Sequence, residues 1–181
     1  MPLWAAQSIR IDAGSTIDCM TGEPLHTNLI DRYMRGCGRR IFRGHRDSEY
    51  FFIADAHPRR LYVHLEVSPS FGDVVTIQVI PVSFFPAADR RRLTGFADAW
   101  NQRNRGVTAI LHESSDPSRV VLTARRSQWI RDDISFEGFM AFTDRTIAAA
   151  IELFADLAVE MELPEVIEFP QAVVTLLRDA S

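Results

Sequence analysis

Alternating hydrophobic and polar positions predict three β-strands in the first half of the chain. The clearest run covers residues 61–67, where polar residues such as Tyr62 and His64 separate aliphatic ones, and residues 75–80 repeat the pattern. Alternation with a period of two is typical of a strand that is buried on one face. Residues 49–55 form a third strand candidate, and the short turns between the runs favour an antiparallel meander.

A stripe of hydrophobic residues at helical spacing predicts a helix from Pro86 to about Asn101. The stripe consists of Leu93, Phe96, Ala97 and Trp100. Their spacing of i, i+3, i+4 and i+7 places them on one side of a helix, and a proline suits its first turn. We expect this helix to end where Asn104 or Gly106 takes the left-handed conformation.

The second half of the chain predicts a hairpin followed by a long helix. Strand-like runs at residues 107–113 and 120–125 flank a polar turn. A capping cluster at residues 132–135 then precedes a helix over residues 136–162. The residues that recur every seven positions in this helix are Met140, Ile147, Phe154 and Met161. Such a stripe favours packing against the sheet, with a dimer seam as the alternative.

The two ends of the chain carry weaker patterns. A first helix is expected to start at Thr27 or Asn28, either of which is a good N-cap, and to stop at Gly36. The region before it is irregular apart from a candidate edge strand at residues 9–12. A last short helix is expected to begin at Pro170.

The order of these elements predicts an α+β fold, α-βββ-α-ββ-α(-α). We expect one antiparallel sheet of about five strands with the helices packed on one face. At 181 residues, a single domain over residues 1–181 is expected. Its core would lie in residues 27–163, with an irregular segment at 1–26 and the short helix within 164–181. A domain of this size buries about 70% of its extended-chain surface and needs neither metal nor disulfide to build a core.

The alternation also assigns the sheet residues to two faces. The face beneath the helices is expected to carry Leu61, Val63, Leu65, Val75, Ile77 and Val79. The opposite, open face is expected to carry Tyr62, His64, Glu66, Thr76, Gln78 and Ile80. The hairpin adds either Thr108, Ile110 and His112 or their neighbours, depending on its register.

We expect the open face to bind a partner. The residues expected to contact it are Tyr62, His64, Ile80, Ile110 and Val121. This set would be apolar enough to hold side chains and polar enough to remain in water, and an extended peptide would lie across it or add to a sheet edge. The alternative is that the first 24 residues or the C-terminal helix cover this face.

Composition and charge describe an ordinary globular protein. The chain is 46% hydrophobic and 24% charged, and its net charge of −4 argues against a nucleic-acid partner. No run approaches the roughly 20 apolar residues of a membrane span. The N-terminus lacks a signal-peptide pattern, so we expect a cytoplasmic protein without a membrane partner. With only Cys19 and Cys37, free thiols are expected rather than a disulfide framework.

No cofactor, metal or catalytic residue is expected. The histidines are His26, His45, His57, His64 and His112. None has the spacing of metal ligands along the sequence, so we predict exposed sheet-face histidines, with no metal at His64 or His112. The residues that a hydrolase site could recruit are His112, Glu113, Ser114 and Asp116. Neighbours on a strand point to opposite faces, which argues against their convergence.

The strongest local charge lies at the two ends of the central helix. It comprises Arg90, Arg91, Arg92, Arg103 and Arg105. A positive run at a helix start opposes the helix dipole and is usually solvated. We therefore expect plain surface here, with an acidic peptide as the next interpretation and nucleic acid as the last.

The order of elements, with Trp100-Asn101 closing the central helix, resembles the YbjN family, which shares its fold with the type III secretion chaperones. The stretch from Ala97 to Arg105 carries the Trp-Asn pair and a basic segment, and residues 133–137 resemble the family's polar cap. Ala97 and Asp98 depart from the first half of the motif. The resemblance covers roughly residues 50–163 and marks Trp100 and Asn101 as structural motif positions.

The resemblance implies a function without catalysis. Family members are described as sensory or regulatory proteins, and the related chaperones bind extended segments of partner proteins, usually as homodimers. We therefore expect a chaperone-like or adaptor domain that binds a protein or peptide as a homodimer. The alternative is a regulatory, sensory-transduction domain that binds a small ligand, and an enzyme ranks third. An exposed apolar patch on the sheet favours the first, and a pocket of roughly 300–1,000 Å³ with convergent polar groups favours the second.

Overall fold

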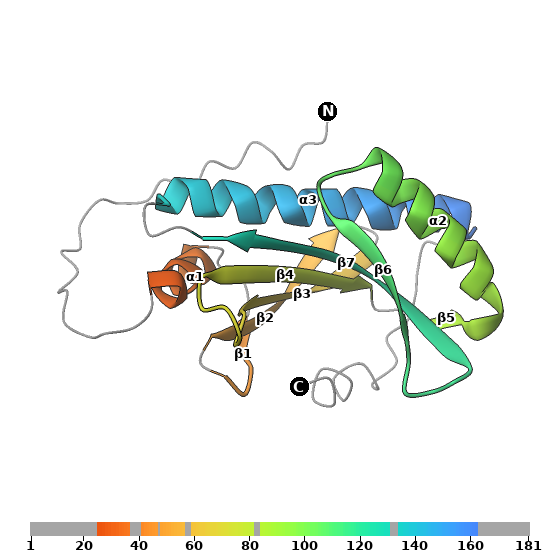
Figure 1. Cartoon of the computed structure of the whole chain (residues 1–181), viewed down its shortest axis with the longest axis horizontal. Helices are drawn as coiled ribbons and strands as arrows, with labels where there is room; N and C mark the ends of the chain where they lie inside the picture. The colour runs from red at the N-terminus through yellow and green to blue at the C-terminus, as the bar shows by residue number, and fades with distance from the viewer. Residues whose placement is uncertain are drawn as a thin grey trace.

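One antiparallel sheet forms the centre of the molecule, and three helices pack against it (Figure 1). The computed structural model describes residues 25–36, 41–46, 48–56, 59–81, 84–130 and 134–162. The helices are α1 (Leu25–Gly36), α2 (Arg90–Arg103) and α3 (Phe136–Glu160). The strands are β1 (Ile41–Arg43), β2 (Glu49–Ala56), β3 (Arg59–Val67), β4 (Val74–Pro81), β5 (Phe85–Pro86), β6 (Thr108–Glu113) and β7 (Arg119–Trp129). The expected strand at 9–12, the helix from Pro170 and both cysteines lie outside the described residues.

Within the described residues the sheet has seven strands in the order β1-β2-β3-β4-β7, with β5 and β6 also paired to β7. Val120 of β7 pairs with Phe85 of β5 and with Glu113 of β6, so these two strands lie on opposite edges of β7. Ala124 likewise lies between Val79 of β4 and Ala109 of β6. Strand β6 is therefore one outer edge of the sheet, and the short strand β1 is the other.

The α+β class and the antiparallel sheet are confirmed, but the expected five strands are seven. The two additional strands, β1 and β5, contain three and two residues. Segments this short cannot display a hydrophobic period. The helix boundaries also differ, because α1 begins at Leu25 rather than at Thr27 or Asn28.

The central helix begins and ends differently from the prediction. Pro86 belongs to β5, and a single 3₁₀ turn, η2 (Ala87–Asp89), separates it from α2. At the other end Asn104 is extended, with φ −117° and ψ 141°, and not left-handed. Its backbone N–H and its Nδ2 both donate to the carbonyl of Trp100, which satisfies an exposed carbonyl of the last turn.

The helices cover one face of the sheet, as expected. Helix α3 runs along β4 and β7, α1 contacts β3 and α3, and α2 packs on β6 (Figure 1). The predicted inward residues Leu61, Val63, Leu65, Val75, Ile77 and Val79 are each 1% exposed or less. In α3, Ile147 and Phe154 are buried in this core, while Met140 and the C-cap residue Met161 pack against its margin. The seven-residue stripe therefore faces the core.

The long helix starts as its capping cluster predicts. The Ser135 side chain accepts a hydrogen bond from the backbone N–H of Gly138, and Glu137 lies in the first turn, where the helix dipole favours an acid. Helix α1 docks on α3 through Tyr33, whose hydroxyl donates to Asp144 at 2.7 Å. No helix in the described part of the chain is long and apolar enough to cross a membrane.

Candidate functional site

The register of the sheet brings the predicted partner-binding residues to the same face. Tyr62 is directly opposite Ile80, and His64 is opposite Gln78. Between β6 and β7, Val121 is opposite His112. Thr123, two residues after Val121 and on the same face, is opposite Ile110. Residues directly opposite in a ladder point to the same face and alternate along each strand. All five predicted residues therefore lie on the open face, away from the three described helices.

These residues are half-buried rather than fully exposed. Tyr62, Ile80, Ile110 and Val121 all have intermediate accessibility. Two apolar residues on this face are more exposed, namely Phe42 of β1 at 50% and Trp129 at the end of β7 at 66%. Because Phe42 is opposite Phe51, and Phe51 is opposite His64, it extends the apolar surface to the edge of the sheet.

Three further residues of this surface lie on β1 and β2 and were not predicted from the sequence, namely Phe42, Phe51 and Ile53. Phe42 was missed because β1 was not predicted. The signal for the other two was present, since Phe51 and Ile53 alternate with the buried Phe52 and Ala54 along β2. The open face is thus more aromatic than Tyr62 alone indicated.

The two motif residues at the end of α2 hold the outer edge of the sheet. Trp100 is 3% exposed, and its Nε1 donates to the carbonyl of Val107 at 3.3 Å. The side-chain amide of Asn101 forms two hydrogen bonds with the backbone of Ala109 in β6. Nδ2 of Asn101 donates to the carbonyl of Ala109 at 2.9 Å, and the N–H of Ala109 donates to Oδ1 of Asn101 at 2.8 Å. These contacts occupy backbone groups that an added strand would need. The beginning of the β6 edge is therefore closed.

A cluster of three titratable side chains lies on the open face at one end of β2 and β3. Nε2 of His64 is 3.3 Å from Oε1 of Glu49 and 4.0 Å from Oε2 of Glu66. The Glu49 side chain is only 5% exposed, and Nε2 of His64 is buried without a hydrogen-bond partner. The ring of Phe51 stacks on the imidazole, with centroids 4.4 Å apart and planes at 9°.

The two sheet histidines differ from each other. His112 is exposed as predicted, and its Nε2 lies 3.0 Å from Oγ1 of Thr123. The prediction of an exposed histidine is wrong for His64, whose side chain is 15% exposed. Burial lowers the pKa of His64 below 6.5, against the opposing effect of Glu66 and Glu49. Partial burial of the imidazole, aided by the positive charge of Arg125, also lowers the pKa of His112.

The residues considered for hydrolysis serve the hairpin turn instead. The Ser114 hydroxyl accepts from the N–H of Asp116, and the Asp116 carboxylate accepts from the N–H and hydroxyl of Ser118. Those hydrogen bonds hold the pKa of Asp116 below its usual value. Since His112 bonds to Thr123 across the ladder, it does not meet Ser114 as a base would.

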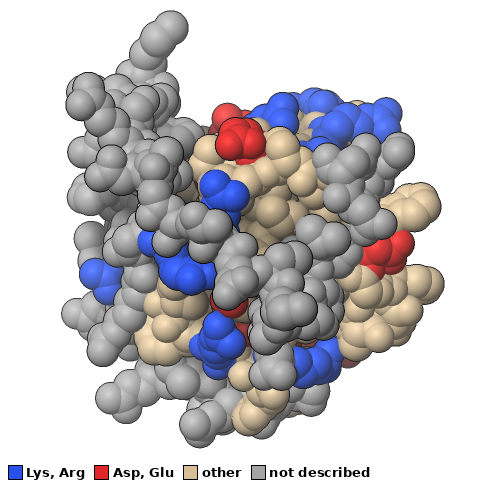
Figure 2. Space-filling view, turned by 90° about the vertical axis from the view of Figure 1, so that its left-hand side faces the viewer, with Lys and Arg blue, Asp and Glu red and all other residues tan. Residues whose placement is uncertain are grey.

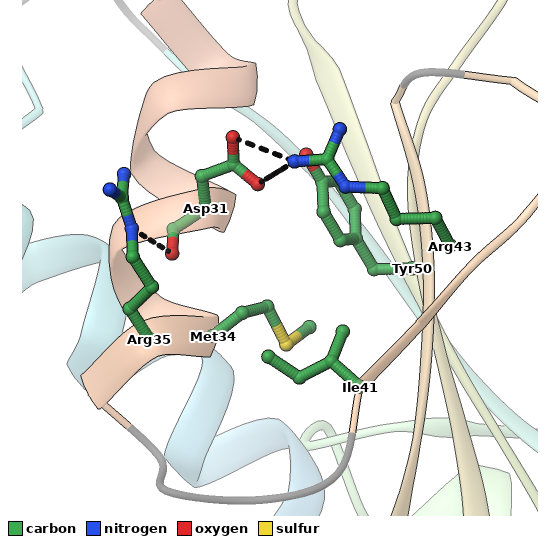
Figure 3. Close-up of a pocket in the computed structure, with 6 residues that line it drawn as sticks. All are labelled: Asp31, Met34, Arg35, Ile41, Arg43 and Tyr50. Atoms are coloured by element: carbon green, nitrogen blue, oxygen red, sulfur yellow. Dashed lines mark hydrogen bonds and ion pairs between the residues drawn. The ribbon is translucent and has the colours of Figure 1, made fainter.

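A second candidate site is a cavity of about 310 Å³ between α1 and the edge of the sheet. It is lined by Asp31, Met34, Arg35, Ile41, Arg43 and Tyr50. The Asp31 carboxylate points toward the sheet, where it accepts from the Tyr50 hydroxyl at 2.7 Å and from Nη2 of Arg43 at 3.0 Å (Figure 3). Met34 and Ile41 point toward one another below this polar group (Figure 3).

Basic side chains are more abundant than acidic ones on the end of the molecule where α1 lies. Figure 2 shows several separate basic groups on this end and fewer acidic ones. The arginines at the start of α2 instead form exposed ion pairs, Arg90 with Glu113 at 3.0 Å and Arg92 with Glu160 at 3.8 Å. The arginines at the start of α2 are therefore exposed, and two of them are paired with acidic neighbours.

The fold resembles solved structures at low sequence identity. YbjN from E. coli, which is described as a candidate transcription regulator, matches with a TM-score of 0.60 and 12% identity over 76% of this chain and 95% of that chain. An uncharacterized protein from Methanothermobacter thermautotrophicus matches with a TM-score of 0.44 and 12% identity over 75% of this chain and 98% of that chain. No protein-family model and no curated protein matches the sequence. The likeness to YbjN confirms the fold that the resemblance implied.

Proposed function

We propose that the chain is a non-enzymatic protein-binding domain, of chaperone or adaptor type, that holds an extended peptide on the open face of its sheet. The observation that carries the proposal is the placement of Tyr62, Ile80, Ile110 and Val121 on one face, opposite the three described helices. Phe42 extends that surface with a side chain that is half accessible. Apolar residues that form a continuous surface are typical of interaction sites.

The closed edge of β6 favours binding across the face over addition of a strand. Asn101 already occupies both backbone groups of Ala109. A peptide that paired with β6 would have to displace this amide, whereas a peptide across the face meets side chains of β2, β3 and β4 directly. Side chains would then contribute most of the affinity.

The test is a double variant, Tyr62→Glu with Ile80→Glu, compared with the wild type on an array of extended peptides. Two charges added to the face would repel apolar peptide side chains, so the variant should fold normally and lose the peptides that the wild type binds. The matched control is Ala99→Glu with Ala155→Glu, which adds the same charge at exposed helix positions. Loss of the folded state in the double variant would show that the face is internal core and would end this proposal.

A second function is supported by the cavity beside α1. Its volume of about 310 Å³ lies at the lower limit of small-ligand sites, and Arg35 and Arg43 line it together with Asp31. This arrangement suits a small anionic ligand, and a sensory domain would fit the regulatory role described for YbjN.

A thermal-shift screen with small carboxylates and phosphates tests the second function. A ligand of the cavity should raise the melting temperature of the wild type and fail to do so for Arg35→Ala and Arg43→Ala. Arg145→Ala is the control, because its Nε donates only to the preceding turn of α3 among the described residues. An equal shift in all four proteins would place the ligand elsewhere.

A further inference from the structure

We propose that Glu49, His64 and Glu66 form a binding site for one divalent transition-metal ion, with zinc as the best-suited cation. The three residues offer one nitrogen and two carboxylate oxygens, and these ligand atoms all lie within 4.8 Å of one another. Zinc binds such atoms at about 2.0–2.2 Å, which places ligand atoms roughly 3–3.5 Å apart. His64 and Glu49 already have this separation, at 3.3 Å, and Glu66 would need to move by about 1 Å.

The charges of the cluster call for a cation. Glu49 and Glu66 are directly opposite each other on β2 and β3, and like charges in such a pair repel. The Glu49 side chain is 95% buried, and buried charges are normally paired or bound to a metal. Among the described residues, His64 is the basic side chain that lies within 4 Å of either carboxylate, and the positive charge of Arg46 acts on His64 from farther away.

The imidazole of His64 does not by itself compensate the charge of the two carboxylates. Its Nε2 is buried and faces both carboxylates, and its contact of 3.3 Å with Oε1 of Glu49 is not a well-aligned hydrogen bond. A buried nitrogen with poorly aligned partners is costly as a hydrogen-bonding group. As a neutral ring with a lone pair on Nε2, it is a metal ligand.

The surrounding structure holds the ligands in place. Phe51 stacks on the His64 ring and fixes its plane. The turn before β2 is closed by hydrogen bonds from the Gly44 N–H to the Glu49 carbonyl and from the Glu49 N–H to the Arg46 carbonyl. A Cβ atom at Gly44 would collide with the side chain of Glu49, so the glycine leaves space for the carboxylate. This preorganisation is what a metal site requires of its supporting residues.

The mixed donor set favours zinc over magnesium or calcium. Magnesium and calcium prefer sites made entirely of oxygen, whereas imidazole nitrogen suits zinc and its neighbours. Three protein ligands would leave a fourth position for water or for a side chain of a bound partner. A metal at His64 differs from the prediction made from spacing along the sequence alone. For His112 we still predict no metal.

Calorimetric titration of the full chain, freed of metal by dialysis against a chelator, tests the site with zinc chloride. The wild type should bind one equivalent of zinc, and magnesium chloride should give no comparable binding. His64→Gln and Glu66→Gln should each weaken zinc binding by at least about tenfold. The matched controls, His112→Gln and Glu113→Gln, remove the same groups from exposed positions of β6 and should leave the affinity unchanged. Absence of zinc binding by the wild type, or unchanged affinity in the cluster variants, would overturn the proposal.

A second measurement needs only the wild type and therefore does not depend on the folding of a variant. Cobalt(II) at this site should shift and broaden the imidazole resonances of His64 while leaving those of His112 sharp. Cobalt effects centred on another histidine would show binding elsewhere and would contradict the assignment.

Discussion

At the scale of single residues, the structure depends on side chains that each join two elements. Trp100 and Asn101 are adjacent in α2, yet one contacts the carbonyl before β6 and the other pairs with the strand itself. Their role is structural because both hydrogen bonds end on backbone atoms. The Trp-Asn pair thus fixes how the central helix sits on the sheet edge.

We predict that Trp100→Ala lowers the free energy of unfolding by about 3–5 kcal/mol. The indole is 3% exposed, so its removal leaves a large cavity and an unpaired carbonyl at Val107. Urea unfolding measures the loss. Val159→Ala is the control, since that side chain is 81% exposed and its truncation should change stability by no more than about 0.5 kcal/mol. An unchanged midpoint for the Trp100 variant would rule out its place in the core.

We predict that His112 makes the stability of the protein depend on pH. Burial and the nearby Arg125 keep its pKa below 6.5 in the folded chain. The unfolded chain therefore takes up the proton first, so the stability that His112 contributes is present above about pH 6.5 and is lost as the pH falls through the lower, folded pKa.

Arg125→Gln should raise the pKa of His112, because it removes a positive charge that disfavours the imidazolium. Burial is the larger cause and remains, so the value should stay below 6.5. An NMR titration of the His112 ring measures both values, with Arg119→Gln as a control on the same hairpin. A pKa above 6.5 in the wild type, or a decrease in the Arg125 variant, would contradict the prediction.

At the scale of elements, length decided what the sequence could predict. The strands β2, β3, β4, β6 and β7 each have at least six residues, and their alternation or β-rich composition was visible. The strands β1 and β5 have too few residues for a period. A proline such as Pro86 is compatible both with the start of a helix and with an edge strand. Pro86 belongs to β5 because it pairs with Arg119 of β7, a contact that the local sequence does not reveal.

Glycines in and after α2 should respond oppositely to substitution. Gly95→Ala should stabilise the protein by about 0.5–1 kcal/mol, because the helix interior favours alanine and nothing lies within 4 Å of the added Cβ. Gly106→Ala should destabilise it by about 1–3 kcal/mol, because its Cβ would lie 2.6 Å from that of Ala149 in α3. The melting temperatures of the two variants, each compared with the wild type, measure these effects. A higher melting temperature for Gly106→Ala would show that Gly106 does not lie in tight contact with α3.

At the scale of the whole molecule, the sequence predicted which face each strand residue occupies but not which residues become neighbours. The period of two is sufficient by itself to assign Tyr62, His64 and Ile80 to the open face. The meeting of His64 with Glu49 depends on the register between β2 and β3, and a shift of one residue would send Glu49 to the other face. A His-x-Glu pair on one strand was the sequence signal that could have drawn attention to Glu66.

Two large aromatic side chains at one corner of the molecule are exposed to solvent. Phe71 and Trp129 are 65% and 66% exposed, and both lie at the corner where the β3–β4 turn meets the end of β7. Val74 joins them there, because it is opposite Trp129 and its N–H donates to the carbonyl of Phe71. Large aromatic side chains in water are costly, and the same patch on a second copy would cover them about a two-fold axis.

We therefore predict a homodimer that contacts itself at this corner. Light scattering at micromolar concentrations should give twice the mass of one chain, and Phe71→Ser with Trp129→Ser should give the monomer mass without loss of the folded state. Val159→Ser is the control, because that side chain is 81% exposed on α3 and its change should leave the dimer intact. A monomer mass for the wild type would contradict dimerisation, and a dimeric double variant would move the contact away from this corner.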